Sequence, residues 1–250
     1  GVQTCALPIY VVFYTDIGID LESKYLSNLR IAPIQIAGYG HPVSTFGSTV
    51  DYFLAGAAVE NQNAKQHYSE RIVLIEGLGI HPTIQKLKTP QAKNKMSNDE
   101  VLINCAWGNL KFNFPMMEIL NRIMQTTKLK VKFQFLPGGA GLNRANNLEV
   151  FKLDLGEMLG EEHCQTVVGQ SYENYLDAIS HGTIGLDSFP FCGFQSVLDN
   201  LTMGIPVVTF RGERAHSRIS SALLETLGME ELDRKSTRLN SSHQIISYAV

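Results

Sequence analysis

The chain has 250 residues, 44% of them hydrophobic, and a formal net charge of -3 at pH 7. This length and composition suit one or two globular domains with a sizeable core. The mildly acidic balance, with no basic stripe, argues against a nucleic-acid partner. No apolar run approaches the roughly 20 residues that a membrane-spanning helix needs, so we expect no membrane span.

The two ends of the sequence differ in character from the middle. Residues 1–9 resemble the translation of a common sequencing adapter, and residues 233–250 resemble the translation of its reverse complement. We expect both segments to be adapter-like artefacts and set them aside from fold reasoning. A native polar tail rich in Ser, Asn and Lys is the alternative for the second segment. On the first interpretation, the natural sequence is expected to run from 10 to 232 and to be cut at both sides.

Residues 10–80 alternate short apolar strands with a helix, which indicates α/β layers around a parallel sheet. The second strand ends in a Gly/Pro-rich loop that contains His41. The polar stretch 81–100, rich in Lys, Asn and Pro, is predicted to be a linker between two lobes. The predicted strands are 10–14, 33–37, 50–54 and 71–75, and the predicted helix is 21–30.

The alternation of strands and helices restarts after the linker, so residues 101–232 are predicted to form a second, doubly wound lobe. Such a sheet binds ligands at the carboxyl ends of its strands. The helix opened by Pro115 is expected to bury one face, with the apolar residues Met116, Leu120, Ile123 and Met124. Strands are predicted over 101–106, 131–136, 183–186 and 205–210, and further helices over 143–159, 172–179, 197–203 and 217–227.

The cysteines show no paired spacing. Cys5 lies in the adapter-like segment, and Cys105, Cys164 and Cys192 are far apart in the sequence. They are expected to be reduced thiols rather than a zinc or disulfide set. We therefore expect a cytoplasmic setting.

Loops after the strands of the second lobe carry the groups that could bind an anion. Lys111 follows the first strand and precedes a helix N-terminus, where a cation and free N–H groups suit a phosphate; a solvated surface lysine is the alternative. Gly138 and Gly139 lie in a loop where backbone could approach a phosphate or ribose, although turns also need glycine. Gln195 and Ser196 open a helix, and Asp199 could accept ribose hydroxyls; an N-cap and a surface acid are the alternatives.

An ordered series of short motifs gives the most specific signal. In order and spacing it resembles the O-GlcNAc transferase family, which includes bacterial cytoplasmic N-glycosyltransferases that glucosylate adhesins. The similarity covers nearly all of residues 10–232. The motif residues are Arg30, Ala32, Pro33 and Gln35; Gly40, His41 and Pro42; Asp51 and Tyr52; Tyr68, Ser69 and Glu70; Leu110 and Lys111; Leu186 and Asp187; Ser196 and Asp199; and Gly204 and Pro206.

This resemblance implies a fragment of a two-lobed GT-B glycosyltransferase with Rossmann-like parallel sheets. Residues 10–80 would be the C-terminal part of the N-terminal, acceptor-side lobe, and residues 101–232 the C-terminal lobe that binds the UDP-sugar. The implied reaction is an inverting, metal-independent transfer of glucose or N-acetylglucosamine from a UDP-sugar to a protein side chain. The UDP-sugar is a co-substrate, and we expect no metal ion and no other cofactor.

Roles follow from the same resemblance, position by position. Lys111 resembles the lysine that neutralises the diphosphate leaving group, and His41 lies in the acceptor-side loop, where it would position the sugar or acceptor or simply cap a turn. Asp199 resembles the aspartate that holds the ribose. The full predicted donor-binding set is Asn109, Gly138, Gly139, Tyr172, Gln195, Ser196 and Asp199. Relatives often carry other residues at Phe194, Gln195 and Gly139, which leaves the donor sugar open.

Two other functions remain open at this point. One is a UDP-binding lobe without turnover, which is expected of this fragment if its missing half completes the active site. The other is a different two-lobed UDP-sugar enzyme, such as a hydrolysing epimerase, which would need acidic and histidine groups upstream. UDP binding with and without transfer separates the first of these from the transferase.

Overall fold

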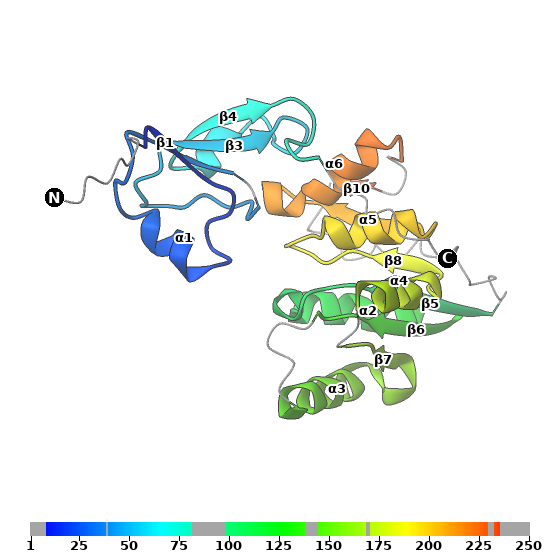
Figure 1. Cartoon of the computed structure of the whole chain (residues 1–250). Helices are drawn as coiled ribbons and strands as arrows, with labels where there is room; N and C mark the ends of the chain where they lie inside the picture. The colour runs from blue at the N-terminus through cyan, green and yellow to red at the C-terminus, as the bar shows by residue number, and fades with distance from the viewer. Residues whose placement is uncertain are drawn as a thin grey trace.

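A computed structural model of the chain describes residues 9–38, 40–81, 99–138, 145–168, 171–229 and 233–235. These residues form two parallel sheets, a four-stranded one in the order β1-β2-β3-β4 and a six-stranded one in the order β10-β9-β8-β5-β6-β7. We call residues 9–81 the N-lobe and residues 99–235 the C-lobe. Figure 1 shows the lobes side by side, with α5 and α6 next to the N-lobe and α3 on the far side of the C-lobe. The predicted α/β class with Rossmann-like parallel sheets is confirmed.

The N-lobe sheet is built in simple sequence order, and each strand is parallel to the next. Strand β4 has the predicted bounds, whereas β3 begins two residues later than predicted. The elements are β1 (Val11–Tyr14), α1 (Leu21–Leu26), β2 (Ile34–Ala37), β3 (Tyr52–Gly56), the short 3₁₀ turn η1 (Ala64–His67) and β4 (Arg71–Ile75).

Helix α1 is shorter than predicted, because it ends at Leu26 instead of continuing to residue 30. The carbonyl of Ser27 accepts hydrogen bonds from the Thr49 N–H and hydroxyl, at 2.8 and 2.9 Å, and the Leu29 carbonyl accepts one from the same hydroxyl. These contacts hold the segment that follows the helix, in which the backbone hydrogen bonds are i→i−3, from the Asn28 N–H to the Tyr25 carbonyl and from the Leu29 N–H to the Leu26 carbonyl. Leu21 and Tyr25, which lie four residues apart in this helix, are exposed.

The order in which strands are added to the C-lobe sheet reverses once along the chain. From β5 the chain builds outward through β6 and β7, and then returns to the other side of β5 to add β8, β9 and β10. The strands are β5 (Glu100–Cys105), β6 (Lys130–Phe135), β7 (Cys164–Thr166), β8 (Ile184–Leu186), β9 (Val207–Arg211) and β10 (Asp233–Lys235). The helices are α2 (Phe114–Thr126), α3 (Ala145–Leu159), α4 (Tyr172–Ser180), α5 (Gln195–Thr202) and α6 (Ile219–Thr226).

Three C-lobe features differ from the sequence prediction. Strand β7 was not predicted, because it is short and partly polar and is defined by its pairing with β6. Strand β10 lies in the segment that was set aside; it pairs with β9, whose edge would otherwise present unpaired N–H and C=O groups. The predicted helix 217–227 is broken at Arg218, whose Nε donates to the Val59 carbonyl of the N-lobe at 2.7 Å.

The cores of the two lobes are joined. One buried cluster contains Phe53 and Val59 from the N-lobe together with Val197, Ile219 and Leu223 from α5 and α6. Burial of apolar surface is the main favourable term in such contacts. Helix α2 packs into a second cluster through the predicted face, to which the structure adds Met117: Met116, Met117, Leu120 and Ile123 are buried, with Met124 packed against them.

Two carboxylates organise the N-lobe. Asp51 Oδ2 accepts hydrogen bonds from Arg30 Nη1 at 2.6 Å and from the Gln35 N–H at 2.8 Å, and so holds the start of β2. Buried Glu70 accepts from Ser44 Oγ and the Thr45 N–H, both at 2.7 Å, and also from the Thr45 hydroxyl. Glu70 therefore anchors the loop of residues 40–49, which carries His41.

We predict that Glu70→Gln destabilises the fold by about 1–3 kcal/mol, because an amide N–H₂ then faces groups that donate hydrogen bonds. Burial raises the pKa of Glu70, but the hydrogen bonds from Thr45 and Ser44 together outweigh it, so the pKa lies below its ordinary value. The contribution of the Glu70 carboxylate to the free energy of unfolding is therefore present above the pKa that this group has in the unfolded chain. It is lost as the pH falls through the pKa of the group in the folded protein. Urea unfolding at neutral and acidic pH measures this contribution.

The exposed Glu76 supplies the control, since Glu76→Gln leaves those hydrogen bonds in place. The difference in unfolding free energy between wild type and Glu70→Gln should narrow on acidification. A difference that stays constant down to acidic pH would contradict the role given to the carboxylate.

Candidate functional site

The reversal of strand order in the C-lobe brings two loops together. Strands β5 and β8 are parallel neighbours, with Ile103 opposite Ile184, so the loops after them leave the sheet at the same edge. The first loop is tied to the second by Trp107 Nε1, which donates to the Leu186 carbonyl at 2.6 Å, and by Asn113 Nδ2, which donates to the Phe189 carbonyl at 2.8 Å. This edge is the switch point at which doubly wound sheets bind ligands.

Lys111 lies between these loops. Its Nζ donates to the Cys192 carbonyl at 2.9 Å and is 5.3 Å from the centroid of the Phe191 ring. Burial lowers the pKa of Lys111, while the charges of Asp187 and Cys192 act in the opposite direction. A partly desolvated ammonium interacts more strongly with an anion than an exposed one does. The alternative of a solvated surface lysine is therefore wrong.

Helix α5 begins at this same edge. Within the described residues its N-cap, Phe194, makes no capping hydrogen bond through its side chain. The first backbone N–H groups of a helix have no partner inside the helix and carry its positive dipole end. Gly193 allows the loop to pass close to the helix start, because a Cβ at that position would lie 2.3 Å from Ser196 Oγ. The start of α5 thus offers Gln195 and Ser196 together with backbone donors.

Asp187 closes the loop that leads into α5. Its Oδ1 accepts from the N–H groups of Ser188 and Gly193 at 2.9 and 2.8 Å, and its Oδ2 accepts from Thr209 Oγ1 at 2.8 Å. Burial raises the pKa of Asp187, and the hydrogen bonds and the Lys111 charge oppose that shift. Asp187 therefore shapes the loop of residues 187–193 from inside.

Three predicted donor-binding residues meet in a hydrogen-bonded cluster. Asp199 Oδ1 accepts from the Tyr172 hydroxyl at 2.6 Å and from Gln195 Nε2 at 2.8 Å. Burial raises the pKa of Asp199, which these hydrogen bonds and one from Tyr175 oppose. Asp199 is buried rather than a surface acid, so that alternative is wrong. The cluster connects the first turn of α4 with the first turn of α5.

The loop after β6 reaches the same edge. The Asn109 N–H donates to the Pro137 carbonyl at 2.9 Å, which joins the loops after β5 and β6. Gly138 has φ +73°, and a Cβ there would meet nothing within 4 Å, so the backbone conformation rather than crowding favours glycine. Gly139 lies outside the described residues.

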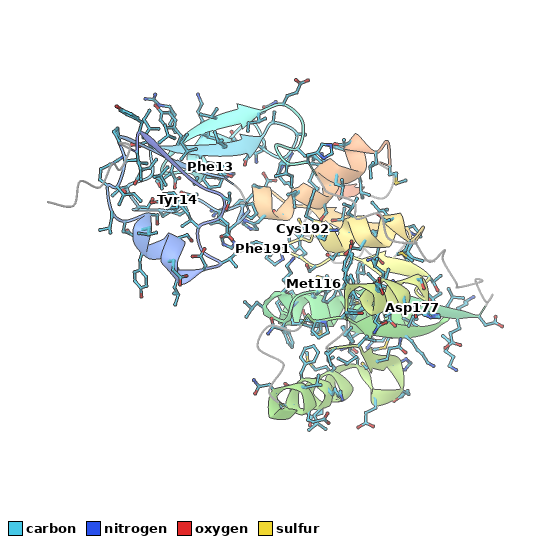
Figure 2. All side chains as sticks on the ribbon, in the orientation of Figure 1. Phe13, Tyr14, Met116, Asp177, Phe191 and Cys192 are labelled. Atoms are coloured by element: carbon cyan, nitrogen blue, oxygen red, sulfur yellow. The ribbon has the colours of Figure 1, made fainter. Side chains whose placement is uncertain are left out.

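His41 reaches this region from the other lobe. Its ring stacks on Phe191 with the centroids 5.6 Å apart and an interplanar angle of 24°. Phe191 in turn stacks on His216 at 5.4 Å and 11°. Figure 2 shows Phe191 and Cys192 where the two lobes meet. The structure therefore brings His41 and Lys111 to the same side chain, that of Phe191.

Sequence reasoning missed Phe191, the Cys192 carbonyl and His216 as parts of this region. The available signal was the run Phe189, Pro190 and Phe191 in a loop between a strand and a helix, which is too short to indicate a role.

Other sequence expectations concern thiols, metals and membranes. Cys105, Cys164 and Cys192 are free cysteines. Among the residues that the structure describes, no group of three or more His, Cys, Asp or Glu side chains is arranged to hold a metal ion. Across the same described ranges, no helix is long and apolar enough to cross a membrane.

Comparisons with known proteins agree with this architecture. No protein-family profile matches the chain. It is 26% identical over 249 residues to the UDP-glucose:protein N-beta-glucosyltransferase of Actinobacillus pleuropneumoniae serotype 5b (strain L20), covering 93% of this chain and 38% of the relative. It is 25% identical over 217 residues to a probable UDP-N-acetylglucosamine--peptide N-acetylglucosaminyltransferase SPINDLY of Solanum lycopersicum, covering 81% and 22%.

A solved structure shows the same fold. A mutant of the Thermobaculum terrenum O-GlcNAc transferase superposes with a TM-score of 0.73 at 19% identity, covering 90% of this chain and 42% of that one. The predicted fold, two lobes with Rossmann-like parallel sheets, is confirmed, as is the resemblance stated from the motifs. The chain spans less than two fifths of the length of the Actinobacillus relative.

We predict that Asp199→Asn lowers the pKa of Tyr172. Burial, together with the hydrogen bond and charge of Asp199, raises that pKa from 10.0 to about 12. Removing the charge makes the phenol easier to ionise, so its pKa should move back toward 10.0. Carbon-13 NMR of ring-labelled tyrosine, titrated through the alkaline range, measures the shift.

Glu173→Gln is the matched control, because it removes an exposed carboxylate from the first turn of the same helix. Glu173→Gln should leave the pKa of Tyr172 unchanged. An unchanged Tyr172 pKa in Asp199→Asn would mean that the cluster does not form in solution.

Proposed function

We propose that the chain is the donor-binding lobe, with part of the acceptor-side lobe, of an inverting, metal-independent glycosyltransferase. The proposed reaction moves glucose or N-acetylglucosamine from a UDP-sugar to a protein side chain. One observation carries the proposal: the Lys111 ammonium and the uncapped start of α5 converge on one loop at the switch point of the sheet. The names of the relatives support the substrate class, since they state UDP-glucose or UDP-N-acetylglucosamine as donor and protein or peptide as acceptor.

The geometry suits the departure of a diphosphate. In the proposed step an acceptor nucleophile attacks the anomeric carbon and forms a new bond, while the bond from that carbon to the β-phosphate oxygen breaks. UDP leaves with the electron pair, and the acceptor gives up its proton. Because negative charge grows on the β-phosphate, a fixed cation and aligned N–H groups stabilise the transition state more than the ground state. Lys111 and the first turn of α5 would supply them.

The Asp199 cluster suits a ribose. A carboxylate offers about four lone-pair sites. Tyr172 and Gln195 use two of them on Oδ1, and Tyr175 adds a further hydrogen bond to the carboxylate. The remaining capacity is proposed to accept ribose hydroxyls, with Ser196 and Gln195 toward the diphosphate. Asn109, Gly138 and Gly139 are proposed to line the donor from the neighbouring loops, and His41 to position the sugar or acceptor from the N-lobe.

The charge balance is proposed to need no metal ion, because Lys111 and the helix start would neutralise the diphosphate. The free cysteines support a cytoplasmic setting, which we include in the proposal. The chain as given is proposed to bind UDP, whereas transfer is proposed for a protein that also carries the further length found in its relatives.

We predict that Lys111→Met in such a complete protein lowers the turnover of sugar transfer by about 10²–10³-fold, as expected for loss of a group that stabilises developing charge. The free energy of unfolding should change much less, because methionine preserves the apolar stem. The rate of UDP release from UDP-glucose and from UDP-N-acetylglucosamine is measured in chelator with a protein acceptor. The effect of the substitution tests the role of Lys111 in the transfer step, and the comparison of the two donors identifies the sugar.

The exposed Lys128 provides the control, and Lys128→Met should leave turnover unchanged. Full turnover by Lys111→Met would remove the leaving-group role. Turnover that disappears in chelator and returns with a divalent cation would remove the metal-independent mechanism.

A further inference from the structure

Several contacts of the candidate site meet at one aromatic side chain, Phe191. His41 of the N-lobe and His216 of the C-lobe both stack on its ring. Lys111 Nζ is 5.3 Å from the ring centroid and donates to the carbonyl of the next residue, Cys192. The ring thus touches both lobes and the cation that the proposed function places against the diphosphate.

We propose that Phe191 is a positioning residue that fixes the Lys111 ammonium and makes its placement depend on the contact between the lobes. The part of this inference that concerns a phosphate ligand rests on the proposed function. The placement of Lys111 by Phe191 does not rest on the proposed function, so the proposed function and the role of Phe191 can be disproved separately.

The Phe191 ring is connected to the Lys111 ammonium through one neighbouring residue, Cys192. Cys192 follows Phe191 in the chain, so a backbone shift that accompanies a change in the packing of the Phe191 ring also shifts the Cys192 carbonyl that accepts from Lys111. That peptide is anchored on its other side, because the N–H and the thiol of Cys192 both donate to the His216 carbonyl at 2.9 Å. The acceptor of the Lys111 hydrogen bond is therefore held by the segment that also supplies the stacked His216 ring.

The segment that supports Phe191 and Cys192 is also linked to the N-lobe. The segment around His216 contacts that lobe directly, since Asn61 Nδ2 donates to the Glu213 carbonyl at 2.6 Å and Arg218 Nε donates to the Val59 carbonyl at 2.7 Å. His41 adds a ring contact from the loop that Glu70 anchors. A change in the spacing of the lobes would consequently alter the packing of Phe191.

The charges around Phe191 are compatible with this role. Burial lowers the pKa of His216, with Arg214, His41 and His67 adding to the shift, so its imidazole is neutral at pH 7. Burial also raises the pKa of the Cys192 thiol to about 12, which keeps it protonated. The ammonium of Lys111 therefore meets the Phe191 ring in a favourable cation–π contact without a competing positive charge from His216.

A double-mutant cycle on UDP affinity tests the ligand part. Phe191→Leu keeps apolar volume without a ring, and Phe191→Tyr keeps the ring. By calorimetry we expect Phe191→Leu to weaken UDP binding about tenfold, as loss of a charge-assisted hydrogen bond would, and Phe191→Tyr to stay within about twofold. In a Lys111→Met background, Phe191→Leu should cause no further loss. An additive loss, or equal effects of Leu and Tyr, would overturn the proposal.

Competitive acetylation tests the placement of Lys111 without any ligand. Trace acetic anhydride labels lysines as a function of pH, and mass spectrometry gives the pKa and reactivity of Lys111. Burial lowers the pKa of Lys111, so Phe191→Leu should raise it and make the amine react more like exposed Lys128. Phe191→Tyr should match wild type. This arm decides the placement even if the wild-type chain does not bind UDP.

A second pair of variants approaches Phe191 from the C-lobe and separates stacking from histidine chemistry. His216→Phe keeps an aromatic ring against Phe191, whereas His216→Ala removes it, and neither changes the backbone carbonyl that holds Cys192. We expect His216→Ala to behave as Phe191→Leu does in the acetylation experiment, and His216→Phe to behave as wild type. Identical Lys111 labelling in both would overturn the proposal. Circular dichroism confirms folding, and this pair decides the result if Phe191→Leu does not fold.

Discussion

The structure of the site depends on the reversal of strand order in the C-lobe sheet. Because β8 returns to lie beside β5, the loops after these strands must share one edge. The indole of Trp107 and the amide of Asn113 bind the carbonyls of the neighbouring loop and hold the two together. Lys111 is half-buried between them for the same reason, and α5 starts where the second loop ends. A cation, a helix N-terminus and a buried carboxylate cluster follow from one topological feature.

The two lobes act as one body around this edge. Their cores merge through Phe53, Val197 and Leu223, and polar contacts from the N-lobe reach the segment of residues 213–218. In the N-lobe, Glu70 holds the loop that presents His41, and Asp51 holds the start of β2. A transferase needs such an arrangement, because its donor and acceptor must be fixed relative to one another before the anomeric carbon can be attacked.

Much of this could be predicted from the sequence, and the exceptions share a cause. Periodic apolar positions predicted α2, and the bounds of β4 were correct. Helix α1 is shorter than predicted: the hydrogen bonds after Leu26 are i→i−3, and Thr49 holds the following segment at Ser27 and Leu29, a contact between distant residues that local periodicity does not contain. In the site, loop position predicted that Lys111, Gln195 and Asp199 would gather at one sheet edge. Phe191 and His216 were missed because their ring contacts join residues that are distant in the sequence: His216 stacks on Phe191 within the C-lobe, and His41 stacks on Phe191 from the N-lobe.

The proposed function requires that this edge bind a nucleoside diphosphate without a metal ion. Calorimetric titration of UDP into the folded chain, in chelator, tests it most directly, with uridine as the matched ligand that lacks phosphates. UDP is predicted to bind without metal and uridine far more weakly, because Lys111 and the start of α5 would act on the diphosphate. Equal affinities for UDP and uridine, or no UDP binding by the folded chain, would contradict it.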